Sequence, residues 1–81
     1  MRTLSELLAE KNITSLRTYM IAENEMIKTS NVIGYVYEDG AWIVYEIDER
    51  RQKTVLKRYQ TEEEAINESF KLIKAYHYMK R

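Results

Sequence analysis

The chain has 81 residues and no cysteine, which limits it to one small domain over residues 1–81 and excludes disulfides, thiolate metal sites and cysteine nucleophiles. Its thirteen basic and thirteen acidic residues cancel, and this argues against general affinity for nucleic acid, which needs a dominant positive field. No stretch approaches the roughly 20 apolar residues that span a bilayer, so we expect a soluble, cytoplasmic protein without membrane contact.

Residues 3–11 are predicted to form a short helix. Thr3 followed by Glu6 is typical of a capping box, in which each side chain bonds the backbone N–H of the other residue. Three leucines share one stripe (Leu4, Leu7 and Leu8), and they must pack on the rest of the domain because nine residues cannot hold a helix alone. Asn12 suits the end of this helix, since asparagine tolerates the left-handed conformation.

Residues 14–31 are compatible with two structures. A helix would place five side chains on one face: Leu16, Tyr19, Met20, Glu23 and Ile27. A strand over residues 17–21 would instead end at the polar turn 23–25, and the β-propensities of Tyr19 and Ile21 favour this strand slightly. Residues 29–31 are predicted to form a turn before the next strand.

Residues 32–48 contain the strongest local signal in the chain. Two runs rich in Val, Ile, Tyr and Trp flank Asp39-Gly40, and Asp-Gly between such runs predicts a hairpin with a type I′ turn. A two-residue loop pairs Glu38 with Ala41 and Tyr37 with Trp42, and the pairing continues in step along both strands. Because side chains alternate along a strand, this register sorts them onto two faces.

The two faces of the predicted hairpin differ in polarity. The first face is nearly all apolar, and we assign it to the core: Val32, Gly34, Val36, Ile43, Tyr45 and Ile47. The second face is aromatic in the middle and acidic at one end, and we assign it to a partly exposed surface: Ile33, Tyr35, Tyr37, Trp42, Val44, Glu46 and Asp48.

A charged loop and a third strand follow the hairpin. Residues 31–49 contain five acids and no base, whereas residues 50–60 contain five bases and no acid. Residues 54–59 are predicted to form the third strand, antiparallel to the second, because sequential strands usually pair. Leu56 and Tyr59 break the alternation of this strand, so either a bulge intervenes or one of the two is exposed.

The last helix is predicted to run from Thr61 to about Tyr78. Thr61 and Glu64 fit a second capping box, and the acids of the first turn suit the helix dipole. A stripe at helical spacing is expected to be buried, with Phe70 at its centre: Ala65, Ile66, Ser69, Phe70, Ile73, Tyr76 and His77. The elements together predict an α+β domain, an antiparallel β-meander of three or four strands with a short N-terminal helix and a C-terminal helix packed on one face.

Candidate catalytic groups are scarce in this sequence. His77 is the one histidine, and we interpret it as a structural or surface residue because the sequence offers few partners for a catalytic or metal site. The acids Glu46, Asp48 and Glu49 lack the glycine-bearing loop of a calcium site, and no phosphate-binding glycine motif is present. We expect no enzyme activity, no metal and no cofactor.

Three aromatic residues of the hairpin, Tyr35, Tyr37 and Trp42, have three interpretations. They could pack against one another across the strands. They could form a protein interface, where Tyr and Trp are enriched. They could stack bases, helped by the basic side chains of residues 50–57. Because five acids share the hairpin, we rank packing first, a protein interface second and nucleic acid third.

The hairpin and the segments after it resemble a known family. The run Tyr35-Val-Tyr-Glu-Asp-Gly-Ala-Trp-Ile-Val-Tyr-Glu-Ile-Asp-Glu-Arg50, a strand ending at Tyr59, the cap Thr61-Glu-Glu-Glu-Ala65 and Phe70 are similar to the small immunity proteins of bacterial polymorphic-toxin systems, particularly immunity protein 59 and its relatives. The resemblance covers residues 34–70 well and residues 4–73 loosely. The chain departs from the family pattern at Arg51, where relatives often have glycine, and over residues 14–31.

This resemblance implies a non-enzymatic protein that binds and neutralises a cognate toxin. From the chemistry of the hairpin we predict that acids face a basic, nuclease-like toxin surface while aromatic side chains anchor the contact. The predicted partner-binding residues are Tyr35, Tyr37, Trp42, Glu46, Asp48, Glu49 and Arg50. The alternative is a small nucleic-acid-associated or regulatory protein that uses the same sheet with Arg50, Arg51, Lys53 and Lys57.

Overall fold

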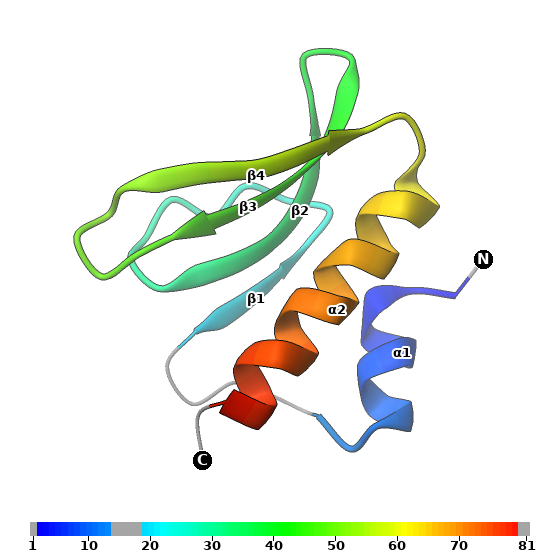
Figure 1. Cartoon of the computed structure of the whole chain (residues 1–81). Coiled ribbons are helices and arrows are strands. Elements are labelled where there is room, and N and C mark those ends of the chain that lie inside the picture. The colour runs from blue at the N-terminus through cyan, green and yellow to red at the C-terminus, as the bar shows by residue number, and fades with distance from the viewer. Residues whose placement is uncertain (1, 14–18, 80–81) are drawn as a thin grey trace.

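A four-stranded sheet has both described helices on one of its faces (Figure 1). The computed structural model describes residues 2–13 and 19–79. Its elements are, in chain order, α1 (Leu4–Glu10), β1 (Met20–Glu23), β2 (Val32–Glu38), β3 (Ala41–Ile47), β4 (Lys53–Tyr59) and α2 (Glu62–Met79), and the strand order is β1-β2-β3-β4. The predicted α+β class, with a short first helix and a long last helix on a mostly antiparallel sheet, is confirmed.

Strands β2, β3 and β4 form the predicted meander. Asp39 and Gly40 both have positive φ, 53° and 79°, and Glu38 pairs with Ala41, so the two-residue turn and its register are confirmed. Between β3 and β4 the register shifts, because Val44 pairs with Lys57 while Tyr45 pairs with Val55. Leu56 is therefore the extra residue of a bulge, which explains the broken alternation of this strand.

Strand β1 is parallel to β2, with Met20 opposite Val32 and Glu23 opposite Tyr35. The favoured prediction of a strand over residues 17–21 is confirmed in kind, but β1 runs from Met20 to Glu23, two residues beyond the predicted end. Residues 17 and 18 of the predicted strand lie outside the described residues. The sheet is mixed, because β1 and β2 are parallel whereas the other two strand pairs are antiparallel. The parallel pair requires the chain to cross over between β1 and β2.

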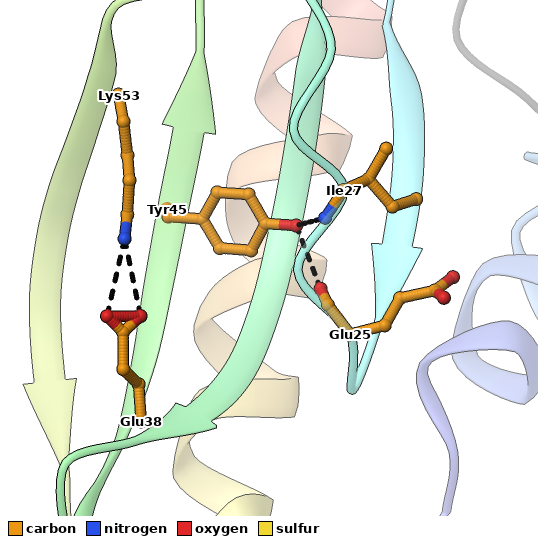
Figure 2. A network of polar contacts seen from close by, with 5 residues as sticks. All are labelled: Glu25, Ile27, Glu38, Tyr45 and Lys53. Carbon is orange, nitrogen blue, oxygen red and sulfur yellow. Dashed lines mark hydrogen bonds and ion pairs between the residues drawn. The ribbon is translucent and has the colours of Figure 1, made fainter.

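The crossover segment, residues 24–31, covers one face of the sheet. Met26 and Ile27 pack on a cluster that contains Val32, Tyr45 and Ile47. The Tyr45 hydroxyl donates to the Glu25 carbonyl at 2.8 Å and accepts from the Ile27 N–H at 3.0 Å, as Figure 2 shows. One buried phenol therefore holds the crossover against the sheet through two hydrogen bonds to its backbone.

The helices cover the opposite face, which carries Ile33, Tyr35 and Val44. The sequence-based assignment of this face to a partly exposed surface is wrong, because Tyr35 is only 1% exposed and Val44 only 2%. The middle of the sheet is covered on both sides, by the helices on one and by residues 24–31 on the other. Alternation shows which side chains share a face, but apolar residues occur on both faces here, so the pattern could not show which of them the helices cover.

Local signals at the ends of the helices act largely as predicted, but the second capping box is only half formed, because the Glu64 carboxylate accepts from the Thr61 hydroxyl at 3.0 Å and not from the Thr61 backbone N–H. Thr3 and Glu6 make both bonds of the capping box, and the Thr61 hydroxyl accepts from the Glu64 N–H at 3.2 Å. Asn12 adopts a left-handed φ of 58° after α1. Along α2, the members of the predicted stripe that are buried are Ala65, Ile66, Ser69 and Ile73, whereas Phe70, Tyr76 and His77 are only partly buried.

Candidate functional site

The β2–β3 turn brings two large aromatic side chains to the end of the hairpin. Residues Tyr37 and Trp42 lie directly opposite each other in the register, and their rings meet edge to face with centroids 5.1 Å apart and planes at 64°. The turn projects clear of both helices at the top of Figure 1. We call Tyr37 and Trp42, together with the turn residues Asp39 and Gly40, the aromatic tip.

The aromatic tip continues into the core through a third ring. Trp42, which is partly buried, packs against Tyr35 in a tilted arrangement, with ring centroids 6.2 Å apart and planes at 48°, and Tyr35 is buried beneath α2. The exposed fraction thus rises along the series Tyr35, Trp42, Tyr37, and Tyr37 reaches 55%. Trp42 on the neighbouring strand holds Tyr37 in place, while more than half of the Tyr37 side chain remains exposed and can be buried by a partner. Residues that anchor protein interfaces have both properties.

Tyr35 supports the aromatic tip from below. Its hydroxyl donates to the Glu62 carboxylate at the start of α2, at 3.4 Å. Burial, followed by the negative charges of Glu62 and Glu23, raises the pKa of Tyr35 to about 12. Tyr35 was predicted to bind a partner directly, but the structure places it inside the domain.

Glu46 is also engaged inside the domain. Its carboxylate accepts from the Tyr19 hydroxyl and from the Tyr76 hydroxyl of α2, each at 2.9 Å. Burial and then this hydrogen bond raise the pKa of Tyr76 to about 12, and the same two causes raise the pKa of Tyr19. The Glu46 carboxylate joins three segments of the chain. Glu46 was predicted to contact a partner, but its side chain is only partly exposed.

The remaining predicted contact residues lie in the β3–β4 turn. The Asp48 carboxylate accepts from the Arg50 N–H at 2.8 Å and the Gln52 N–H at 2.9 Å, so this side chain shapes the turn. Glu49 and Arg50 are exposed, and Arg51 has a left-handed φ of 65°, the conformation that glycine adopts most easily.

The seven predicted contact residues do not form one patch. Trp42 lies near the start of β3 and Asp48 directly follows its end, so six residue steps of about 3.3 Å separate them by roughly 20 Å along the strand. The predicted contact residues therefore lie in three places. Tyr37 and Trp42 belong to the aromatic tip, Tyr35 and Glu46 are engaged inside the domain, and the other three lie in the β3–β4 turn. The tip has its own acids, Asp39, which is exposed, and Glu38, whose carboxylate lies 3.3 Å from the Lys53 ammonium (Figure 2).

A second surface was not foreseen from the sequence. A groove of about 480 Å³ runs between β4 and α2 and is lined by Val44, Leu56, Lys57, Tyr59, Glu68, Lys71, Leu72 and Ala75. The signal that could have revealed it is the broken alternation at Leu56, because the bulge leaves this side chain 43% exposed beside the groove. We call it the β4–α2 groove.

Other candidate chemistry is sparse in the part of the chain that the structure describes. Within residues 2–13 and 19–79 no cluster of three or more His, Asp or Glu side chains is arranged to hold a metal ion. His77 packs edge to face on Tyr78, with ring centroids 5.1 Å apart. None of the helices described is both long enough and apolar enough to cross a membrane.

Comparison of the chain with protein-family models, with curated proteins and with solved structures finds no match.

Proposed function

We propose that this chain is a non-catalytic binding protein of the immunity type, which binds and neutralises a cognate bacterial toxin in the cytoplasm. The observation that supports this most is the aromatic tip, where Tyr37 is more than half exposed and packs edge to face against Trp42 on the neighbouring strand. A rigid, exposed aromatic side chain loses little conformational entropy on binding and gains most of its burial. The resemblance of residues 34–70 to immunity proteins supplies the class of partner.

The charges around the aromatic tip define the toxin surface that suits it. Glu38 and Asp39 stand next to Tyr37 in the chain, and no base occurs between residues 31 and 49. Acids of this kind steer a basic partner toward the tip and speed association at low salt. Lys53 neutralises part of this field by its contact with Glu38, so Asp39 is the acid at the tip that is most open to a partner.

Base stacking receives less support from the arrangement of the rings. A single-strand binder offers several exposed aromatic faces in a row beside its basic residues. Of the four aromatic residues of the hairpin only Tyr37 is more than half exposed, because Tyr35 and Tyr45 are buried and Trp42 is partly covered. We therefore keep nucleic acid as an outcome of the test.

The test measures binding to the toxin-like protein encoded next to the gene for this chain. Tyr37→Ala should weaken binding by about tenfold to a hundredfold, as expected for an aromatic hot spot, with little loss of stability. Asp39→Asn should slow association and flatten its salt dependence, and asparagine keeps the left-handed turn. Tyr78→Ala, at another exposed tyrosine far along the sequence on α2, is the matched control and should bind like the wild type.

Two results would contradict the proposal. One is full affinity for the toxin in Tyr37→Ala, which would show that the aromatic tip is not the contact. The other is tight, salt-sensitive binding of a single-stranded oligonucleotide in the absence of any toxin partner, which would replace immunity by a nucleic-acid function.

A further inference from the structure

The outer edge of β4 is a long, open strand edge. β4 has seven residues and ends the strand order, and residues 53–58 are all exposed. The chain contains no proline, so each residue of β4 keeps its backbone N–H. An edge strand of this kind presents N–H and C=O groups that can pair with a strand from another protein.

The β4–α2 groove lies on the helix side of this edge. Lys57 and Tyr59 point to the helix side, as their pairing with Val44 and Trp42 shows, and the bulge residue Leu56 adds apolar surface there. Leu72 and Ala75 of α2 form the opposite wall. The groove is therefore suited to apolar side chains that project from every second residue of an added strand.

The other side of the edge is basic. Lys53 and Arg58 pair with Ile47 and Ile43, which places both on the face away from the helices. Residues 50–60 contain five bases and no acid, and the turn before β4 contributes Arg50 and Arg51 to this charge. A strand that offers acidic side chains on this side would be electrostatically matched.

A second copy of the chain is a poor occupant of this edge. Pairing β4 with β4 would bring Lys53, Lys57 and Arg58 of one chain against the same three bases of the other, with no acid in either strand. Like charges on neighbouring strands are destabilising, and lysines and bulges are common means of keeping edge strands from self-pairing.

We propose that the β4 edge binds an extended acidic segment of a partner protein as a fifth strand. Apolar side chains of the segment enter the β4–α2 groove, and the alternate acidic side chains face Lys53 and Arg58. This site lies on a different element from the aromatic tip and does not depend on the proposed function, so the two are tested separately.

The probe is a capped, fluorescently labelled seven-residue peptide that alternates glutamate and valine, and the readout is its fluorescence anisotropy with the full chain. Lys53→Glu combined with Arg58→Glu should weaken binding by at least about tenfold, because both bases lie on the side that the acidic side chains face. Lys11→Glu combined with Lys28→Glu makes the same change in net charge at exposed sites outside β4 and should change affinity by less than about twofold.

Two modified peptides keep the test independent of how well the protein variants fold. N-methylation of alternate backbone nitrogens removes the donors of strand pairing and should abolish binding to the wild-type chain. Replacing each glutamate with lysine should do the same. Equal binding of either modified peptide, or no binding of the unmodified one, would overturn the proposal. Sedimentation of the wild type as a dimer, in which the outward backbone N–H groups of β4 are protected from hydrogen exchange, would overturn it in favour of a second copy.

Discussion

Gly34 is required where β2 lies beside Ala22 of β1. A Cβ at this position would overlap the carbonyl oxygen of Ala22 and its side chain, both on the neighbouring strand. The sequence alone identifies Gly34 as a strand glycine, but the reason for it depends on the parallel partner β1. Gly40 is the opposite case, because its φ of 79° requires glycine while the space around it is open.

Gly34→Ala should destabilise the protein by at least about 2 kcal/mol, since the obstacle is backbone and cannot rotate away. Gly40→Ala should cost only about 1 kcal/mol, the price of a left-handed alanine. Denaturant melts of the two variants measure both values on the same scale. A loss below about 1 kcal/mol for Gly34→Ala would mean that β1 is displaced from β2 at little cost.

The residues whose roles could be read from the sequence are those with local partners. Thr3, Asn12 and Asp39 each act within a few residues of themselves, and each adopts the expected conformation. Tyr45 was correctly assigned to the core and Glu46 was expected to contact a partner, but the hydrogen bonds that both make could not be predicted because their partners are distant in the chain. The Tyr45 hydroxyl bonds the backbone of residues 25 and 27, and Glu46 bonds tyrosines 27 and 30 residues away.

Helix α2 shows the same limit at the scale of an element. Its capping residue and its extent were predictable, and so were most members of the buried stripe. The centre of the stripe was not, because Ile66 and Ile73 are fully buried while Phe70 is partly exposed and has the Lys74 ammonium 4.6 Å from its ring centre. Helical spacing fixes the direction of a stripe only to within one residue on either side.

Ile73→Ala should therefore destabilise the protein by about 2–5 kcal/mol, because it leaves a cavity between α2 and the sheet. Phe70→Ala should cost less, about 1–2 kcal/mol, since part of the ring already contacts water. Chemical denaturation of both variants decides the order. A larger loss for Phe70→Ala than for Ile73→Ala would show that α2 is rotated relative to this structure.

At the scale of the whole molecule, tyrosine–carboxylate hydrogen bonds join elements that are far apart in the chain. Glu46 of β3 holds Tyr19, which precedes β1, and Tyr76 of α2, and Tyr35 of β2 holds Glu62 at the start of α2. Tyr19 and Tyr76 also stack, with ring centroids 5.3 Å apart. These part-buried contacts lie on the helix side of the sheet, which the sequence analysis assigned to a partly exposed surface. Alternation along the strands could not predict that carboxylates and tyrosine hydroxyls would be paired there.

This arrangement makes stability sensitive to alkaline pH. The pKa values of Tyr35 and Tyr76 are raised from 10.0 to about 12 in the folded state, first by burial. The unfolded chain therefore releases these protons at lower pH than the folded chain does, and the stabilisation is complete below pH 10 and lost as the pH rises toward about 12.

Denaturant melts across this range should show a steady fall in the free energy of unfolding. Tyr76→Phe should make the fall shallower, because one of the protons no longer contributes, whereas Tyr37→Phe removes a hydroxyl from an exposed ring and is the matched control. An unchanged slope in Tyr76→Phe would show that its hydroxyl is open to water and does not bond Glu46.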